Sequence, residues 1–344
     1  MRADTRGPNE AGLRREEHVP RLVSVVIPAY NAASWIEATV GSVRAQTYHP
    51  IEVIVADDGS SDETPHLAEA LGATVVRTSR AGPGGARNGG MAAARGDFLQ
   101  FLDADDMLAP NKIARQVALL SSSGADVAWE PFHHLVATAA PDAYELGCRI
   151  VPALSDDLAA SLLSARGFMQ IGTVLIRRSP NTDAVRFVED YDAVEDVRYL
   201  VELAMRGARF ASSDSSELGL LFRQHPGPRH SARPAASFAR GCAANAMWAE
   251  AQWSRDGSLT TERRIALGEA YAFAARQLAA VDAAAFREVA ERGVAHGDAF
   301  LRHLPSRLRW LTRVVGYQRA ESIAVTWRRA RGTDGAMIDP MEAR

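Results

Sequence analysis

The sequence lacks several features that would assign it to common classes of protein. Its two cysteines, Cys148 and Cys242, have neither the CxxC spacing of a zinc or redox site nor the density of a disulfide scaffold, so a reduced cytoplasmic setting fits best. No run approaches the roughly 20 apolar residues of a membrane span. Residues 1–20 carry charge but no apolar core, which excludes a signal peptide. The formal net charge of -3 gives no general attraction to nucleic acid, so we expect no nucleic-acid partner.

What remains is an ordinary soluble composition. The chain has 344 residues, of which 47% are hydrophobic and 24% charged, enough for one large domain or two ordinary ones. We expect four parts: a disordered lead-in over 1–20, a main domain over 21–235, a helical C-terminal region over 236–331 and a disordered tail over 332–344.

Strand patterns alternate with helix patterns through the main domain. Strands are expected over 22–27, 51–56, 74–77, 97–102, 172–176 and 218–222. Helices are expected over 35–46 with Ser34 as its cap, from 61 onward, after a Gly-rich loop at 81–85 through to 94, over 157–165 and over 194–206. This alternation predicts an α/β fold with a mostly parallel sheet, and the near-continuous apolar strands predict helices on both of its faces.

Polar clusters follow three of the predicted strands. Tyr30, the pair Asp57 and Asp58, and the pair Asp103 and Asp105 each come after an apolar run. Ligands of open α/β sheets bind beyond the carboxyl ends of the strands, so these clusters should share one crevice. Carboxylates two residues apart are typical ligands of Mg²⁺, although a solvated turn would use the same residues.

Two further clusters have a functional and a structural interpretation. Gly82–Gly90 lacks the Lys-Ser/Thr of a P-loop, but its Arg87 could neutralise a pyrophosphate. Glu195 and Asp196 begin an amphipathic helix, where adjacent residues differ by about 100°, so only one can point squarely into a cleft as a general base. Acids favoured by a helix N-terminus are the alternative.

In this order and combination, the clusters resemble family 2 glycosyltransferases of the GT-A fold. The matching segments are VSVVIPAYN (23–31), VADDGSSDET (55–64), GGARNGGMAAARGDFLQFLDADD (84–106), VED (194–196) and LFRQHPGPRHS (221–231). The resemblance covers roughly residues 22–231 and implies that 21–235 form a GT-A domain with a Rossmann-like sheet.

The resemblance implies a nucleotide-sugar site. Pro28, Ala29 and Tyr30 would line the nucleoside pocket, Asp58 would contact the base, and Asp57 would support the loop.

Further along the chain, Arg87 would contact the nucleotide, and Asp103 with Ala104 would lie at the ribose or sugar. Asp105 would be the principal ligand of Mn²⁺ or Mg²⁺, and His225 would help to hold the metal or the diphosphate.

The implied reaction is an inverting transfer. Asp196 would take a proton from an acceptor hydroxyl, which attacks the anomeric carbon while the nucleoside diphosphate leaves, and Glu195 would support it. The implied donor is a nucleotide diphosphate sugar, UDP-linked by preference, and the acceptor is a glycan, a lipid-linked saccharide or a small molecule. One carboxylate base is enough because no covalent glycosyl-enzyme forms.

Other interpretations remain open. Gln224 is not followed by the Arg-Trp of processive synthases, which favours transfer of one or a few sugars. A sugar-1-phosphate nucleotidyltransferase would need a GxGTR-type loop where this chain has IPAYN, and a non-catalytic nucleotide-sugar binder would not need Asp105 and Asp196. Residues 302–331 are rich in Arg and Trp, which predicts either a basic amphipathic helix lying peripherally on an anionic membrane or a helix packed on the domain.

Overall fold

The computed structural model describes residues 21–138, 143–189, 193–213, 216–224 and 235–330. The lead-in predicted over 1–20, the tail predicted over 332–344 and the predicted ligand His225 lie outside these residues.

A seven-stranded sheet forms the centre of the first part of the chain. Its strands, in spatial order, are β10 (Phe210–Ser212), β6 (Val127–Trp129), β9 (Val174–Arg177), β4 (Phe98–Phe101), β1 (Val23–Ala29), β2 (Ile51–Asp57) and β3 (Thr74–Arg77). Only β9 runs antiparallel to its neighbours. The predicted α/β class and mostly parallel sheet are therefore confirmed.

Helices cover both faces of this sheet. They are α1 (Ile36–Arg44), α2 (Thr64–Ala70), α3 (Gly82–Ala93), α4 (Lys112–Ser123), α5 (Leu158–Leu163) and α6 (Glu195–Met205), with short 3₁₀ turns at Ala165–Gly167 and Ile171–Thr173. Alternate residues of β1 enter different cores: Val26 joins the core with α3, α5 and α6, while Val25 and Ile27 join the core with α1 and α4. This two-sided burial explains why the strands are apolar along their whole length.

A second sheet was not predicted from the sequence. Its strands, in order, are β5 (Met107–Leu108), β11 (Leu220–Gln224), β7 (Phe132–Ala137) and β8 (Tyr144–Ile150). Strand β5 follows the Asp-rich segment directly, and its pairing with β11 brings residues 220–224 back to that segment.

Two local predictions were wrong. The glycines from Gly82 onward are part of the helix α3 itself rather than of a loop. Glycine is needed at Gly84 because the helix packs closely there: a Cβ on Gly84 would lie 2.2 Å from the Val188 carbonyl oxygen. On Gly90 it would lie 2.3 Å from Cγ1 of Val26. Helix α1 begins after Trp35, and Ser34 does not cap it.

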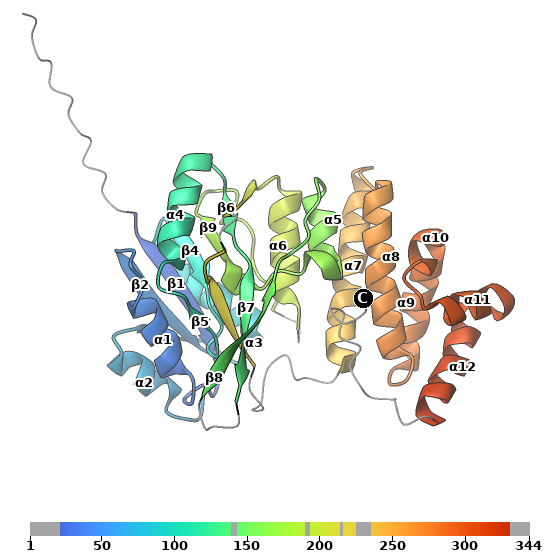
Figure 1. Cartoon of the computed structure of the whole chain (residues 1–344), viewed down its shortest axis with the longest axis horizontal. Coiled ribbons are helices and arrows are strands. Elements are labelled where there is room, and N and C mark those ends of the chain that lie inside the picture. Colours follow the sequence, from blue (N-terminus) through green and yellow to red (C-terminus); the bar gives the residue numbers. More distant parts are fainter. Residues whose placement is uncertain (1–20, 139–142, 190–192, 214–215, 225–234, 331–344) are drawn as a thin grey trace, which may run out of the picture.

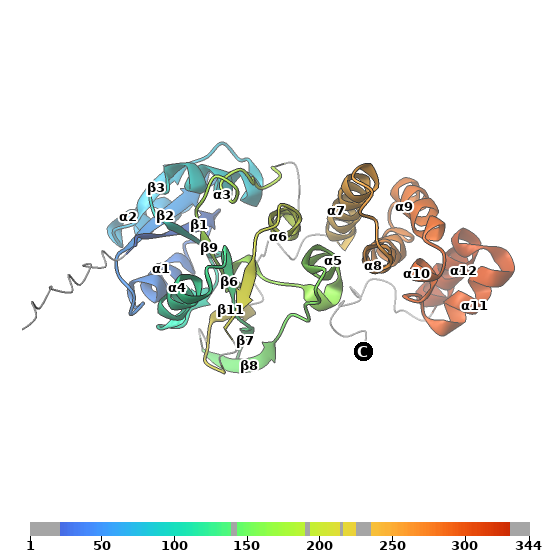
Figure 2. The same cartoon turned by 90° about the horizontal axis from the view of Figure 1, so that it is seen from above.

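The C-terminal helices stack beyond α5 and α6. They are α7 (Ala235–Arg255), α8 (Thr261–Leu278), α9 (Ala283–Ala295), α10 (Asp298–Leu301), α11 (Ser306–Val315) and α12 (Tyr317–Ala330). Figures 1 and 2 show an elongated molecule, with the sheets at one end and α11 and α12 at the other. The single helix expected over 302–331 is two helices, separated at Gly316, whose φ is 78°. Within the described ranges, no helix is long and apolar enough to cross a membrane.

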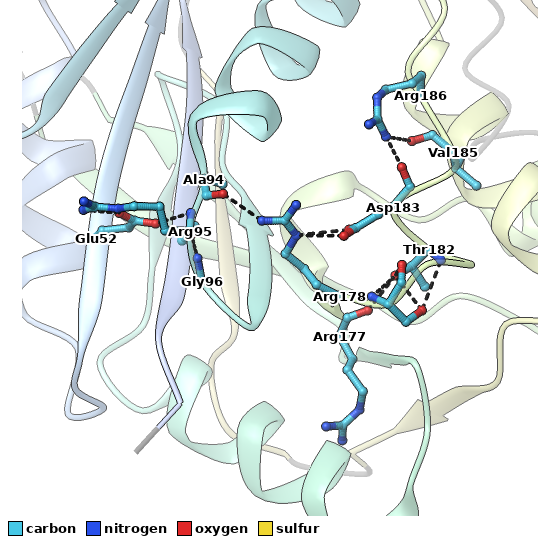
Figure 3. A network of polar contacts seen from close by, with 12 residues as sticks. Glu52, Ala94, Arg95, Gly96, Arg177, Arg178, Thr182, Asp183, Val185 and Arg186 are labelled. Carbon is cyan, nitrogen blue, oxygen red and sulfur yellow. Dashed lines mark hydrogen bonds and ion pairs between the residues drawn. The ribbon is translucent and has the colours of Figure 1, made fainter. Parts of the chain in front are cut away.

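A polar network fixes the C-terminal end of α3, as Figure 3 shows. Arg178 donates to the Ala94 carbonyl at 2.7 Å and pairs with Asp183 at 3.0 Å. On the other side, Arg95 pairs with Glu52 of β2 at 2.8 Å. The last turn of α3 is thereby tied to β2 and to the segment after β9, which limits how the helix can shift.

Candidate functional site

The predicted nucleoside residues lie side by side at the carboxyl edge of the large sheet. Strands β1 and β2 are parallel and in register, with Ala29 opposite Asp57. The Asp58 backbone N–H donates to the Ala29 carbonyl at 2.8 Å, which continues the pairing past the strand ends. Tyr30 follows at once and is 55% exposed, so its ring is accessible at this edge.

The two adjacent aspartates have different surroundings. The Asp58 carboxylate accepts three hydrogen bonds, from the Thr78 hydroxyl at 2.8 Å and from the backbone N–H groups of Ala81 and Gly82 at 2.9 Å each. It thus anchors the start of α3. Asp57 is fully buried, and within the described part of the chain its Oδ2 has no hydrogen-bond partner. Buried polar atoms are normally paired, so this oxygen has an unused acceptor position next to the proposed site.

Arg87 lies at the centre of a group of acids drawn from three elements. Its guanidinium is 4% exposed and pairs with Asp103, which follows β4, at 2.7 Å and with Glu195 of α6. Burial opposes the charge on Arg87, but Asp103, Glu195 and Asp196 outweigh it and raise its pKa. The sequence-predicted residues Arg87, Asp103, Glu195 and Asp196 are therefore brought together, with one cation among three carboxylates.

Asp196 has the titration behaviour that a general base needs. Burial, then the neighbouring charge of Glu195, raise the pKa of Asp196 to about 7, while Arg87 partly opposes the rise. Its Oδ1 accepts a hydrogen bond from the Val197 N–H at 2.8 Å. A base whose pKa lies near neutral pH combines a usable ionised fraction with a strong affinity for the proton. Glu195, by contrast, is held by Arg87, so the two adjacent acids have different surroundings.

Helix α7 holds the start of α6 in place, a contact that was not predicted from the sequence. Val194 precedes α6 with a φ of 61°, a conformation that is strained for a β-branched residue. The buried side chain of Asn245 donates to the Val194 carbonyl at 2.9 Å. Gly241 allows the approach, since a Cβ there would lie 2.6 Å from the Ala193 carbonyl oxygen. These contacts join residues about 50 positions apart, which no local pattern reveals.

The Asp-rich segment contains one acid with a structural role. Asp106 is 2% exposed and accepts a hydrogen bond from the Arg223 N–H of β11 at 2.9 Å; burial and its acidic neighbours raise its pKa well above the usual range. The preceding turn is held by the Thr39 hydroxyl, which donates to the Ala104 carbonyl at 2.7 Å. Asp103 and Asp105 flank this turn.

The carboxylate side chains at this site are of the chemical type that binds a divalent cation. Asp103 and Asp105 supply carboxylate oxygens, which Mn²⁺ and Mg²⁺ accept, and the acids around Arg87 leave an excess of negative charge. Among the described residues, no group of three or more His, Cys, Asp or Glu side chains is arranged to hold a metal ion. The metal site thus stays a prediction that includes His225, outside those residues.

Comparisons with known proteins bear on the family and the fold. Residues 24–134 match the family described as "Glycosyl transferase family 2". Over 110 residues, 31% of this chain, the sequence is 40% identical to the succinoglycan biosynthesis protein ExoO of Rhizobium meliloti and covers 32% of it. The chain spans less than half of the length of the first curated relatives that it matches.

Solved structures extend the likeness to the whole fold. S. aureus TarS (residues 1–349), in a complex with UDP-GlcNAc, superposes with a TM-score of 0.64 at 19% identity, over 90% of this chain and 92% of that one. The mannosyltransferase PcManGT of Pyrobaculum calidifontis, in a complex with GDP-Man and Mn²⁺, gives 0.50 at 18% identity, over 91% and 89%. The likeness covers the C-terminal helices as well as the sheet, and it confirms the GT-A fold.

Proposed function

We propose that this chain, which belongs to glycosyl transferase family 2 through residues 24–134, is an inverting, metal-dependent glycosyltransferase that uses a nucleotide diphosphate sugar. The observation that carries the proposal is the cluster of Arg87, Asp103, Glu195 and Asp196, in which Asp196 has a pKa of about 7. A non-catalytic binder would have no need of a carboxylate raised to neutral pKa beside the sugar position.

The donor would bind along the carboxyl edge of the sheet. Pro28, Ala29 and Tyr30 would line the nucleoside pocket beside Asp57 and Asp58. UDP is our first choice of nucleotide, supported by the UDP-GlcNAc bound to the structurally similar TarS; the GDP-Man bound to PcManGT makes a guanosine donor the alternative.

In the reaction, Asp196 would accept the proton of an acceptor hydroxyl as that oxygen attacks the anomeric carbon. Arg87 would hold the Glu195 side chain in place through their ion pair, so that the α6 N-terminus presents Asp196 alone to the acceptor. Asp103, paired with Arg87 at 2.7 Å, would orient the ribose or sugar. The bond between the anomeric carbon and the phosphate oxygen breaks as the new glycosidic bond forms, and the nucleoside diphosphate leaves.

Asp105, with His225 as a second ligand, would hold Mn²⁺ or Mg²⁺. When bound, such a cation neutralises the charge that develops on the leaving diphosphate. The Mn²⁺ in the PcManGT complex supports this assignment, as does the surplus of carboxylates in the cluster.

The acceptor would be a glycan, a lipid-linked saccharide or a small molecule. The match to a succinoglycan biosynthesis protein supports a role in cell-surface polysaccharide synthesis. We place the enzyme in the cytoplasm, in keeping with Cys148 and Cys242, which are both free thiols.

A thermal-shift screen of nucleotide sugars, with and without Mn²⁺, tests the proposal. A bound donor raises the apparent stability by about 2.7 kcal/mol at a concentration of 100 times its Kd. We expect stabilisation by one donor class that depends on the metal and is lost in Asp105→Ala. Donor turnover that survives both Asp105→Ala and Asp196→Asn would refute the mechanism, and no response to any nucleotide sugar would refute the function.

A further inference from the structure

The pair of helices α11 and α12 exposes large apolar side chains at the end of the molecule farthest from the sheets (Figures 1 and 2). Trp310 and Val314 of α11 are 65% and 63% exposed, and Ile323 and Trp327 of α12 are 37% and 59% exposed. In each helix the two residues are four positions apart, so they lie on one face. We call these four residues the apolar strip.

The apolar strip borders a groove rather than a flat surface. A groove of about 410 Å³ lies between the two helices and is lined by Ser306, Arg307, Trp310, Leu311 and Trp327. The two indole rings therefore approach the same opening from different helices. Tryptophan combines a large apolar ring with a polar N–H, a combination favoured at the boundary between water and lipid.

The segment that carries the strip also exposes arginines, of which Arg307 lines the groove. The arginines with exposed side chains are Arg302, Arg307, Arg313, Arg319 and Arg329. The one acid between residues 302 and 330 is Glu321, which is buried and pairs with Arg328 at 2.7 Å, so it does not offset the exposed charges. The whole chain has a net charge of -3, and this segment is locally basic against that background.

We propose that the α11–α12 surface docks on an anionic membrane, with the apolar strip at the level of the lipid headgroups and the arginines on the phosphates. Exposed indoles at a groove mouth, and exposed arginines on a segment whose one acid is buried, match the two requirements of an interfacial helix, apolar insertion and attraction to anionic lipid. Such docking would hold the enzyme beside a lipid-linked acceptor. The inference does not depend on the proposed reaction.

Co-sedimentation of the full chain with vesicles tests the docking. We expect binding to vesicles of phosphatidylcholine and phosphatidylglycerol at 3:1, little binding to phosphatidylcholine alone, and release at high salt because screening weakens attraction between exposed charges. Each arginine near such a surface contributes about fivefold to affinity, so the triple variant Arg307→Gln, Arg313→Gln, Arg319→Gln should bind on the order of a hundredfold more weakly.

A matched control removes the same charge elsewhere. Arg255→Gln, Arg264→Gln, Arg287→Gln alters exposed arginines on α7, α8 and α9 and should leave most of the binding intact. The double variant Trp310→Ala, Trp327→Ala tests the contribution of the apolar strip and should lower the affinity for anionic vesicles at least tenfold. Its melting temperature should be unchanged, since both rings are exposed.

Three outcomes would overturn the proposal: no binding of the full chain to anionic vesicles, equal binding to neutral ones, or equal losses in the arginine variant and its control. A second copy of the chain is the other occupant that the strip could accept. Loss of self-association in the tryptophan variant, with vesicle binding preserved, would likewise overturn membrane docking.

Discussion

Replacing Asp196 by Asn should separate the catalytic value of this carboxyl from its effect on stability. The pKa of Asp196 is raised from 3.8 to about 7 by burial and by Glu195, so its ionised form is unfavourable in the folded protein. An unfolded chain ionises this group near pH 4. Native stability is therefore lost as the pH rises from about 4 to about 7, and the cost is complete above pH 7.

The shift of about three units sets an upper bound of about 4 kcal/mol on this cost, at about 1.4 kcal/mol per unit. Asparagine has the same shape and no charge, so Asp196→Asn should melt several degrees above the wild type at pH 8 and at the same temperature at pH 4. Release of nucleoside diphosphate should fall by about 10² to 10⁴, the usual contribution of a general base. For the wild type, kcat/KM should reach half of its maximum near pH 7 and level off above about pH 8.

Differential scanning fluorimetry at pH 4, 6 and 8, with initial rates over the same range, measures both effects. Glu202→Gln is the matched control, because Glu202 lies on the same helix but pairs with Arg206 at 3.1 Å, remote from the cluster. A stability gain that does not depend on pH, or a variant that keeps wild-type turnover, would refute the assignment of Asp196 as the base.

Two other changes probe the surrounding residues. Arg87 lowers the pKa of Asp196, so Arg87→Gln should move the rise in kcat/KM to higher pH, visible as a larger loss of rate at pH 7 than at pH 9. It should also destabilise the fold by about 3–5 kcal/mol, because the buried carboxylate of Glu195 loses its partner. Asp58→Asn leaves one side-chain oxygen for the hydrogen bonds at the start of α3, so we expect a loss of about 1–3 kcal/mol in denaturant unfolding and weaker donor binding in calorimetry. An unchanged pH profile in the first variant, or unchanged stability in the second, would contradict these interpretations.

The sheet was predictable because its signals are local. Strand β3 has the predicted bounds, and β1, β2 and β4 lie within two residues of theirs. Strands β1, β2 and β4 are largely apolar runs followed by polar residues, and burial on both faces leaves little freedom in their composition, whereas β3 is a short, partly exposed edge strand. Asp58 and Asp103 could then be placed at one edge of the sheet, because the carboxyl ends of parallel strands lie at the same edge.

The Gly-rich helix and the second sheet were missed because their causes are tertiary. Glycine disfavours helix in isolation, yet Gly84 and Gly90 are required by the close approach of α3 to Val188 and Val26. Strand β5 has two residues and owes its pairing to β11, more than 100 positions away. A sequence window cannot detect either contact.

The individual roles within the site were the least predictable part. Arg87 and Glu195 were each predicted as site residues, but their ion pair was not, because 108 positions separate them in the sequence. Whether a carboxyl has a pKa near 4 or near 7 depends on such neighbours. The differentiation between Glu195 and Asp196 therefore emerges only when α3, β4 and α6 are assembled.

The strained residue before α6 offers a test of how α7 controls the base. Val194 has a φ of 61°, and Asn245 holds its carbonyl at 2.9 Å. If this hydrogen bond stabilises the strained conformation, Asn245→Ala should let the start of α6 relax and displace Asp196. We expect a fall in kcat of about tenfold or more, with the KM for the donor little changed, because the residues proposed to bind the donor's nucleoside lie on other elements.

Glycine adopts positive φ without strain, so Val194→Gly removes the need for support. The double variant Val194→Gly, Asn245→Ala should then lose less activity than the two single losses combined, an interaction that a double-mutant cycle on kcat measures. Strictly additive losses would show that Asn245 acts on stability alone and not through Val194.

The choice of substitution at position 245 also matters. Asn245→Asp is a poor substitute, because a carboxylate cannot donate to the Val194 carbonyl. Asn245→Gln keeps the donor and should preserve part of the rate. The cycle thus distinguishes a positioning role for α7 from simple packing, which would lower the melting temperature but leave the coupling between positions 194 and 245 near zero.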